Sequence, residues 1–204
     1  MIPRLPMRVV KVGGSLLDWS ELPTALEDWL ARQSPARSIL IAGGGELVEA
    51  IRKADAAHGL GESTAHWLCI DLLSITARLL ASLTRSRLEQ RLEDLRSSDG
   101  TRCVFDPAPF LRNEEPLHAP PLLPTTWEVT SDSIAARIAQ VMSADELVLL
   151  KSGLPPEGVD FRDAAAADYV DRYLPTAAAP LPLVRCVNLR SPRLDEMSWT
   201  AAKP

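Results

Sequence analysis

Two short apolar runs near the start of the chain each end in a glycine cluster. Residues 9–12 lead into Gly13-Gly14-Ser15, and residues 38–42 lead into Gly43-Gly44-Gly45. Short branched runs of this kind are typical of buried parallel strands. Glycine lets the backbone come close to a ligand, and the start of a following helix adds a positive dipole end. The two junctions therefore predict a site that binds phosphate groups.

Charged residues accompany these junctions. Lys11 precedes the first glycine cluster, and Lys151 ends another apolar run at 146–151. Phosphoryl transfer needs positioning of the reactants and compensation of negative charge on the moving group. We therefore interpret Lys11 as the cation beside a transferred phosphoryl group. Backbone amides would hold the phosphate oxygens, and they belong to Gly13, Gly14, Gly43 and Gly44.

Periodicity along the chain predicts alternating strands and helices. Strands are expected at 9–12, 37–42, 102–105, 146–151 and 183–188, and helices near 22–30, 47–54, 63–95 (one or two), 134–142 and 163–173. This alternation predicts a three-layer α/β/α sandwich with a mostly parallel central sheet. Ligands bind beyond the carboxyl ends of such strands, so both glycine clusters, Lys151 and the helix start at Asp132 should converge on one sheet edge.

The chain is expected to form a single domain over residues 1–204. Residues 106–124 hold six prolines and are interpreted as a long loop or irregular hairpin. Residues 190–204 are interpreted as a loose tail.

Charge and cysteine content exclude several classes of protein. A net charge of −5 and a pI of about 5.3 argue against general nucleic-acid binding. The cysteines, which are Cys69, Cys103 and Cys186, have no CxxC spacing, so neither a disulfide framework nor a zinc cluster is expected. No signal peptide and no membrane-spanning run is recognised. We therefore expect a cytoplasmic protein with no membrane or nucleic-acid partner.

Two common phosphate-binding motifs, G-x-x-x-x-G-K-[ST] and G-x-G-x-x-G, are absent. The ordered trio of Lys11-Val12-Gly13-Gly14-Ser15, Gly43-Gly44-Gly45 and 130–136 instead resembles the amino acid kinase family, which includes acetylglutamate, aspartate, carbamate and uridylate kinases. The resemblance covers roughly residues 7–151 and implies an ATP-dependent kinase. It implies that Ser15 contacts nucleotide phosphates, that Asp132 orients the lysine, and that Lys151 lies near the nucleotide.

The same resemblance implies further features of the site. Magnesium (Mg2+) would bridge ATP oxygens with few protein ligands, so no metal site made by the protein alone is expected. The acceptor would meet Gly43, Gly44, Gly45 and Ser131. Segments 65–70 and 127–136 are most similar to a subgroup that phosphorylates an aminomethylfuran methyl phosphate in methanofuran biosynthesis. Family members usually self-associate, which implies a homo-oligomer with the 63–95 helical stretch as a candidate interface.

The chain departs from the family pattern where a second catalytic lysine is usual. Lys151 or an arginine such as Arg162 would supply this cation, or the protein is a non-catalytic, kinase-like binding or regulatory subunit. An open pocket around Lys151 would favour catalysis. A kinase acting on an amino-acid carboxylate remains a third interpretation. Arginines 102 and 112 would favour a phosphorylated acceptor and acidic residues 106, 114 and 115 a cationic amine, so these residues do not decide between acceptors. His66 and Trp67 are interpreted as a packed pair or as substrate contacts.

Overall fold

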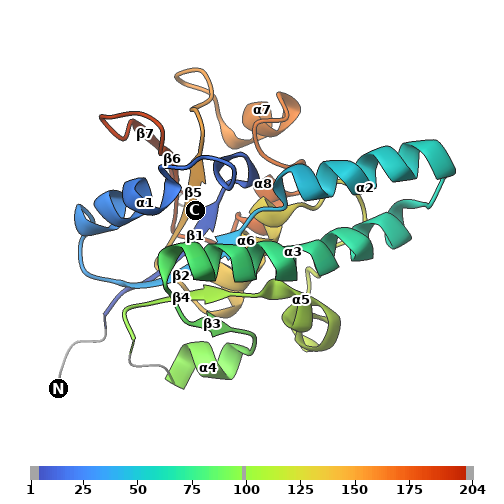
Figure 1. The fold of residues 1–204 in the computed structure, drawn as a ribbon, viewed down its shortest axis with the longest axis horizontal. Helices are drawn as coiled ribbons and strands as arrows, with labels where there is room; N and C mark the ends of the chain where they lie inside the picture. Colours follow the sequence, from blue (N-terminus) through green and yellow to red (C-terminus); the bar gives the residue numbers. More distant parts are fainter. Residues whose placement is uncertain (1–4, 98–99, 201–204) are drawn as a thin grey trace.

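The computed structural model describes residues 5–97 and 100–200, and its centre is a seven-stranded sheet (Figure 1). The strand order is β3-β4-β2-β1-β5-β6-β7. The strands are β1 (Met7–Val12), β2 (Arg37–Ala42), β3 (Leu88–Glu89), β4 (Arg102–Phe105), β5 (Glu146–Lys151), β6 (Leu183–Asn188) and β7 (Glu196–Thr200). Neighbouring strands are parallel except β6 and β7. The predicted mostly parallel α/β sandwich is therefore confirmed.

Helices cover both faces of this sheet. They are α1 (Leu22–Ala31), α2 (Gly45–His58), α3 (Glu62–Thr84), α4 (Leu92–Ser97), α5 (Pro107–Pro109), α6 (Ser131–Val141), α7 (Phe161–Ala166) and α8 (Leu174–Ala177), with short turns η1 (Gly14–Leu16), η2 (Phe110–Glu114) and η3 (Glu115–Leu117). Helices α2 and α3 pack against each other and extend together beyond the sheet (Figure 1).

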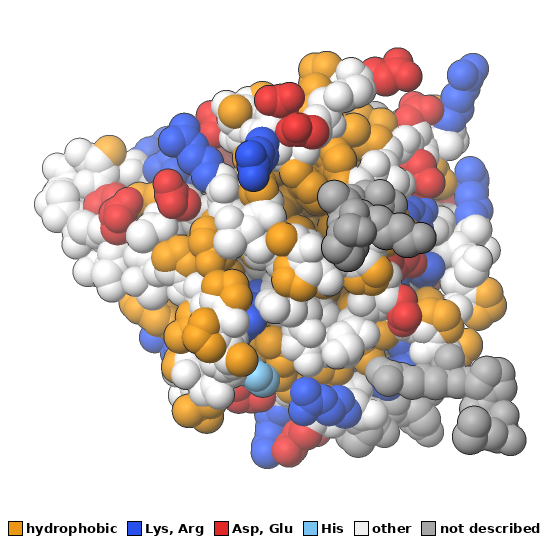
Figure 2. Space-filling view, turned by 180° about the vertical axis from the view of Figure 1, so that it is seen from behind, with side chains coloured by type: hydrophobic (Ala, Val, Ile, Leu, Met, Phe, Trp, Pro, Cys, Tyr) orange, Lys and Arg blue, Asp and Glu red, His pale blue; other side chains and the backbone are white. Residues whose placement is uncertain are grey.

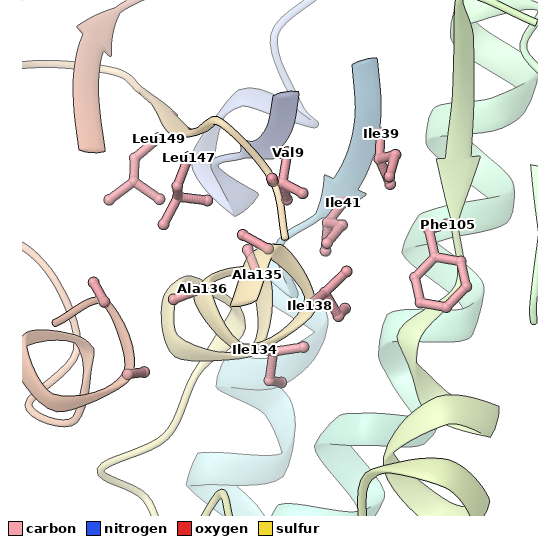
Figure 3. Close-up of a cluster of buried hydrophobic side chains, with 14 of the residues drawn as sticks. Val9, Ile39, Ile41, Phe105, Ile134, Ala135, Ala136, Ile138, Leu147 and Leu149 are labelled. Atoms are coloured by element: carbon pink, nitrogen blue, oxygen red, sulfur yellow. The ribbon is translucent and has the colours of Figure 1, made fainter. Parts of the chain in front are cut away.

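Alternating strand residues build two cores, because successive side chains of a strand point to opposite faces. On one face, strand side chains point toward α6, which presents Ile134, Ala135 and Ile138 (Figure 3). On the other face, Val10, Leu40 and Val148 pack with residues of α1 and the second half of α3. Both cores are nearly free of solvent, so α6 and the strand ends are held rigidly.

The helical stretch predicted for 63–95 ends earlier than expected. Helix α3 stops at Thr84, because Arg85 adopts a left-handed conformation with φ of 50°. The backbone then forms β3, and α4 begins at Leu92, whose side chain is buried with that of Leu95. The prediction missed this break because neither glycine nor proline marks it.

Two expectations about irregular segments are corrected by the structure. Residues 106–124 are not a hairpin: they contain α5, η2 and η3, with Phe110 buried in the core. A buried ion pair of Glu115 with Arg137 of α6 fixes this segment. The predicted loose tail is wrong through residue 200, since β7 pairs with β6 and Trp199 donates to the Val159 carbonyl. Residues 201–204 lie outside the described residues.

The surface mixes both charge signs. On the face turned away in Figure 1, basic and acidic side chains are scattered among apolar and uncharged ones (Figure 2). Within the described ranges, one helix, α3, is long and apolar enough to span a membrane by length and composition alone. The buried side of α3 packs against β2 and β4.

Candidate active site

The carboxyl ends of β1, β2 and β5 bring the two glycine clusters together. Val12 is in register with Ala42 on one side and Leu150 on the other. Backbone bonds then join the turns, as Gly13 N–H donates to the Leu150 carbonyl (2.8 Å) and Gly43 N–H donates to the Val12 carbonyl (2.8 Å). The expected convergence on one sheet edge is what the structure shows.

Glycine is required where the two turns touch. A Cβ atom on Gly14 would lie 2.3 Å from the backbone nitrogen of Gly45, far inside van der Waals contact. Gly45 itself has φ of +59°, a left-handed conformation that glycine adopts without strain. Helix η1 starts at Gly14 and α2 starts at Gly45, so the first amides of two helices, which have no partner within their helix, lie at this contact.

Asp132, at the start of α6, lies between two lysines. Its Oδ1 is 2.9 Å from Lys11 Nζ, and its Oδ2 accepts a hydrogen bond of 2.6 Å from Lys151 Nζ. Lys11 and Asp132 are buried, and the Lys151 side chain is 16% exposed. Lys151 also donates to the Tyr169 carbonyl, at 2.8 Å. Two cations and one anion therefore form a fixed cluster with a net positive charge.

The pKa values in this cluster are shifted by burial and by the mutual field. Burial alone raises the pKa of Asp132, but the charges of Lys11 and Lys151 outweigh it and hold that pKa well below the usual range. The pKa of Lys11 is lowered by burial and by Lys151, against the opposing effect of Asp132. Asp132 thus remains ionised at neutral pH and is a poor proton acceptor.

A second carboxylate, Asp171, fixes the start of α6. Its Oδ2 accepts bonds of 2.9 Å from the Thr130 amide, the Thr130 hydroxyl and the Ser133 amide. Its Oδ1 accepts from the Ser133 hydroxyl and from the Leu174 amide. Burial and the nearby Asp132 charge raise the pKa of Asp171. This carboxylate links the chain after β5 to the helix that presents Asp132.

Two cavities that share part of their lining lie at this edge of the sheet. One, of about 330 Å³, lies among α2, α3 and α6; its walls include Gly14, Gly44, Gly45, Val48, His66, Cys69, Ile70, Leu73, Trp127, Ser131 and Ile134. The other, of about 690 Å³, contains Lys11, Asp132 and Lys151. Arg52, Trp127, Glu49 and Thr130 line both. We call the first the apolar cavity and the second the lysine cavity.

The remaining predicted residues take different places. Ser15 and Ser131 line the apolar cavity, and the Ser15 hydroxyl is 3.2 Å from that of Ser152. The amides of Gly13 and Gly43 were expected to hold phosphate oxygens, but this expectation is wrong, because both donate to the carbonyls of neighbouring strand ends. His66 lines the apolar cavity, where its Nδ1 is 3.3 Å from the Thr126 carbonyl. Burial lowers the pKa of His66, against the effect of that bond.

Several candidate charges lie outside the site. Arg102 pairs with Glu27, and Arg112 pairs with Asp71 while its guanidinium lies over the Trp67 ring. Arg162 is exposed on α7. Asp106 caps α5, where it accepts from the Ala108 amide. The second cation of the cluster is therefore Lys151, and none of these arginines lines either cavity.

The sequence interpretation missed Arg52, Tyr169 and Asp171. Arg52 is on the same side of α2 as Val48 and Glu49, a helical spacing that points it to the cavity. Asp171 follows no recognisable motif, since its partners are 38 and 41 residues away in sequence. Trp127 lies in the segment 127–136 that resembles a kinase subgroup, but no role was predicted for it.

Comparisons with known proteins place this geometry in a known group. The sequence model of the amino acid kinase family matches residues 6–153. A UMP kinase from Bacillus anthracis superposes with a TM-score of 0.63 at 14% identity, covering 93% of this chain and 90% of that one. A UMP kinase from Ureaplasma parvum gives 0.65 at 11% identity, with 93% and 92% covered. At these identities the likeness shows the fold alone.

A curated relative is similar in sequence as well. The [5-(aminomethyl)furan-3-yl]methyl phosphate kinase of Methanocaldococcus jannaschii is 26% identical over 146 residues, which is 70% of this chain. The match spans 64% of that relative's length. With the family match extending over more than half of its residues, the chain belongs to the amino acid kinase family.

Proposed function

We propose that this protein is a kinase that transfers the γ-phosphoryl group of ATP to a small anionic acceptor. The observation that carries the proposal is the Asp132 carboxylate held between Lys11 and Lys151 at the edge where the two glycine turns meet. A metaphosphate-like group in transfer carries negative charge on its oxygens. Fixed cations stabilise that charge without reorganisation during the reaction.

The residues divide the work between charge and position. Lys11 and Lys151 offset the charge of the moving group, and Asp132 keeps both ammonium groups in place. The starts of η1 and α2, at Gly14 and Gly45, lie against each other, and amides at helix starts suit phosphate oxygens. Mg2+, bound mainly by the nucleotide phosphates, would add further charge compensation.

The state of Asp132 favours an acceptor that is already ionised. Both carboxylate oxygens face lysines, and the lowered pKa makes Asp132 a poor general base. A phosphate or carboxylate attacks as an anion and needs no base. One acceptor oxygen would bond to the γ-phosphorus while the bond to the β–γ bridging oxygen breaks, and ADP leaves with the electron pair. We therefore favour anionic acceptors over neutral alcohols.

The apolar cavity supports a specific acceptor. Its floor is apolar, with Val48, Ile70 and Leu73, and its lining includes the carboxylates of Asp18, Glu46 and Glu49 together with Arg52. In an acceptor with a flat apolar ring, an ammonium group and a phosphate, the ring would contact the apolar floor, the ammonium group would pair with a carboxylate, and the phosphate would pair with Arg52. The acceptor named for the curated relative has this composition. We therefore propose an aminomethylfuran methyl phosphate, converted to its diphosphate in methanofuran-type one-carbon metabolism, as the acceptor.

The alternative, a non-catalytic binding subunit, is less well supported. That interpretation expects a side chain to fill the space around Lys151, whereas this lysine lines a cavity of about 690 Å³. An amino-acid carboxylate is chemically acceptable to the same lysines, so aspartate and glutamate should be assayed as acceptors beside the furan phosphate. Because the proposed reaction uses ATP, we propose that the protein acts in the cytoplasm.

Calorimetry with a non-hydrolysable ATP analogue and Mg2+ tests the proposal directly. Binding to the wild type that weakens in Lys11→Ala is expected, followed by ADP release when the aminomethylfuran phosphate is added. Lys53→Ala, which removes an exposed lysine of α2, is the matched control. A folded wild type that binds no analogue would reject the kinase assignment in favour of a binding subunit.

Self-association is proposed through α3. Leu68, Ile75 and Leu79 are 38%, 52% and 43% exposed and, with the half-buried Leu72, form one stripe along the helix. An antiparallel copy of α3 would cover this stripe. Because Asp71 and Arg78 are two helical turns apart, Asp71 of each copy would then lie near Arg78 of the other. The surface is thus self-complementary, as a two-fold interface requires.

A further inference from the structure

Among the residues described, four line both the apolar cavity and the lysine cavity, and Arg52 is one of them. Its guanidinium lies over the ring of Trp127, with Cζ 4.5 Å from the ring centroid. Stacking of this kind fixes the plane of a guanidinium and leaves its edge available for hydrogen bonds. The contact with the Trp127 ring therefore limits the orientations that this partly exposed side chain adopts before a ligand binds.

The surface that supports Arg52 is itself fixed. The indole Nε1 of Trp127 donates to Asp55 Oδ2 at 2.9 Å, and Asp55 Oδ1 accepts from the Gly61 amide at 3.0 Å. These bonds tie the tryptophan, which precedes α6, to the turn between α2 and α3.

The hydrogen-bonding edge of Arg52 is unused within the part of the chain that the structure describes. Its Nε is 3.3 Å from Glu49 Oε1, and no described residue accepts from its two terminal nitrogens. The pair with Glu49 joins side chains that are 47% and 49% exposed, an arrangement that adds little stability. Arg52 lines both cavities, so the two N–H donors of this edge are available there, in a geometry that matches two oxygens of one phosphate.

We propose that Arg52, stacked on Trp127, binds the phosphate of the acceptor and holds it at the mouth of the lysine cavity. This inference rests on the proposed function and extends it, since it assigns the group that recognises the accepting phosphate. The ring of the acceptor lies in the apolar cavity, and its phosphate lies between Arg52 and the Lys11–Asp132–Lys151 cluster. Arg52 thereby selects acceptors that are already phosphorylated.

The test compares a phosphate ligand with its matched alcohol. In Arg52→Met, the KM for [5-(aminomethyl)furan-3-yl]methyl phosphate should rise about 10- to 100-fold, the range for a lost charge-assisted contact. Inhibition by [5-(aminomethyl)furan-3-yl]methanol, which lacks the phosphate, should not change. Binding of the ATP analogue should not change either. Lys53→Met, one residue along the same helix and exposed, is the control for loss of a positive charge.

Two more variants separate charge from geometry. Arg52→Lys keeps the charge without the two-pronged edge and should recover only part of the lost affinity. Trp127→Phe keeps a ring but loses the bond to Asp55, so it should raise the KM less than Arg52→Met does.

Each outcome has a distinct meaning. An unchanged KM in an active Arg52→Met enzyme would overturn the assignment of Arg52 and leave the kinase proposal standing. Equal weakening of the phosphate and of the alcohol would overturn it as well, because Arg52 would then only shape the cavity. A wild type that phosphorylates no arylmethyl phosphate would reject the proposed acceptor, and the inference with it.

Discussion

Replacing Lys151 with methionine removes one of the two cations that flank Asp132. The substitution keeps an unbranched side chain of similar length at the end of β5, so the packing there changes little. The remaining Lys11–Asp132 pair is neutral as a whole, whereas the intact cluster is positive. The transferred phosphoryl group would therefore lose a full compensating charge.

The expected loss of rate follows from the position of that charge. An ammonium group about 4 Å from a phosphoryl oxygen contributes about 4 kcal/mol at an effective dielectric constant near 20. Part of this interaction is already present in the bound ATP, and only the gain in the transition state affects kcat. We expect a loss of about 2 to 4 kcal/mol, or roughly 30- to 1,000-fold in kcat.

A coupled assay of ADP release measures this effect, with circular dichroism and thermal unfolding to show that the variant folds. Arg162→Met, which removes an exposed charge of α7, is the control and should keep wild-type turnover. If Lys151→Met retained wild-type kcat while Arg162→Met lost it, the assignment of the second cation to Lys151 would be wrong.

The other predictions concern protonation, the glycine contact, the core and the α3 surface. Burial lowers the pKa of Lys11, so kcat/KM should fall on the alkaline side at a lower pH than for an ordinary lysine. Asp132→Asn removes a charge that raises this pKa, so it should shift the alkaline fall in kcat/KM to a still lower pH. An NMR titration of the Lys11 ammonium should show the same shift. Gly14→Ala should abolish turnover because its Cβ would lie 2.3 Å from Gly45 N, whereas the Cβ of Gly153→Ala meets no atom within 4 Å and should leave turnover unchanged. Equal turnover in the two variants would refute the close contact. Phe105→Ala should cost about 3 to 5 kcal/mol in urea unfolding, against less than about 0.5 kcal/mol for Leu117→Ala, whose side chain is 84% exposed. Ile75→Glu should convert a dimer to a monomer in light scattering, and a wild type that is already monomeric would contradict the α3 interface.

Local patterns predicted the parts of the fold that depend on local sequence. The strands at 37–42 and 146–151 were predicted in full because each contains an unbroken apolar run, at 39–42 and 147–150, which is typical of a buried parallel strand. The glycine clusters were informative because only glycine fits where Gly14 meets Gly45. Strand β7 was missed, since an antiparallel edge strand with one exposed face carries polar residues such as Glu196 and Ser198.

Long-range contacts determined the rest of the site. Nothing near Asp171 in the sequence indicates that it accepts bonds from Thr130 and Ser133. The resemblance to a kinase family suggested that Asp132 orients Lys11, but the second contact of Asp132 with Lys151 is visible only in three dimensions. The stacking of Arg52 on Trp127 likewise joins two elements whose approach no local pattern encodes.

The central claim is that the lysine pair around Asp132 transfers a phosphoryl group to an anionic acceptor. Phosphorus NMR of a mixture of ATP, Mg2+ and [5-(aminomethyl)furan-3-yl]methyl phosphate tests it most directly. The wild type should convert the monoester signal into the two coupled signals of a diphosphate as ADP appears, and Lys11→Ala should not. A folded wild type that yields only inorganic phosphate, or a Lys11→Ala variant that forms the diphosphate at the wild-type rate, would contradict the claim.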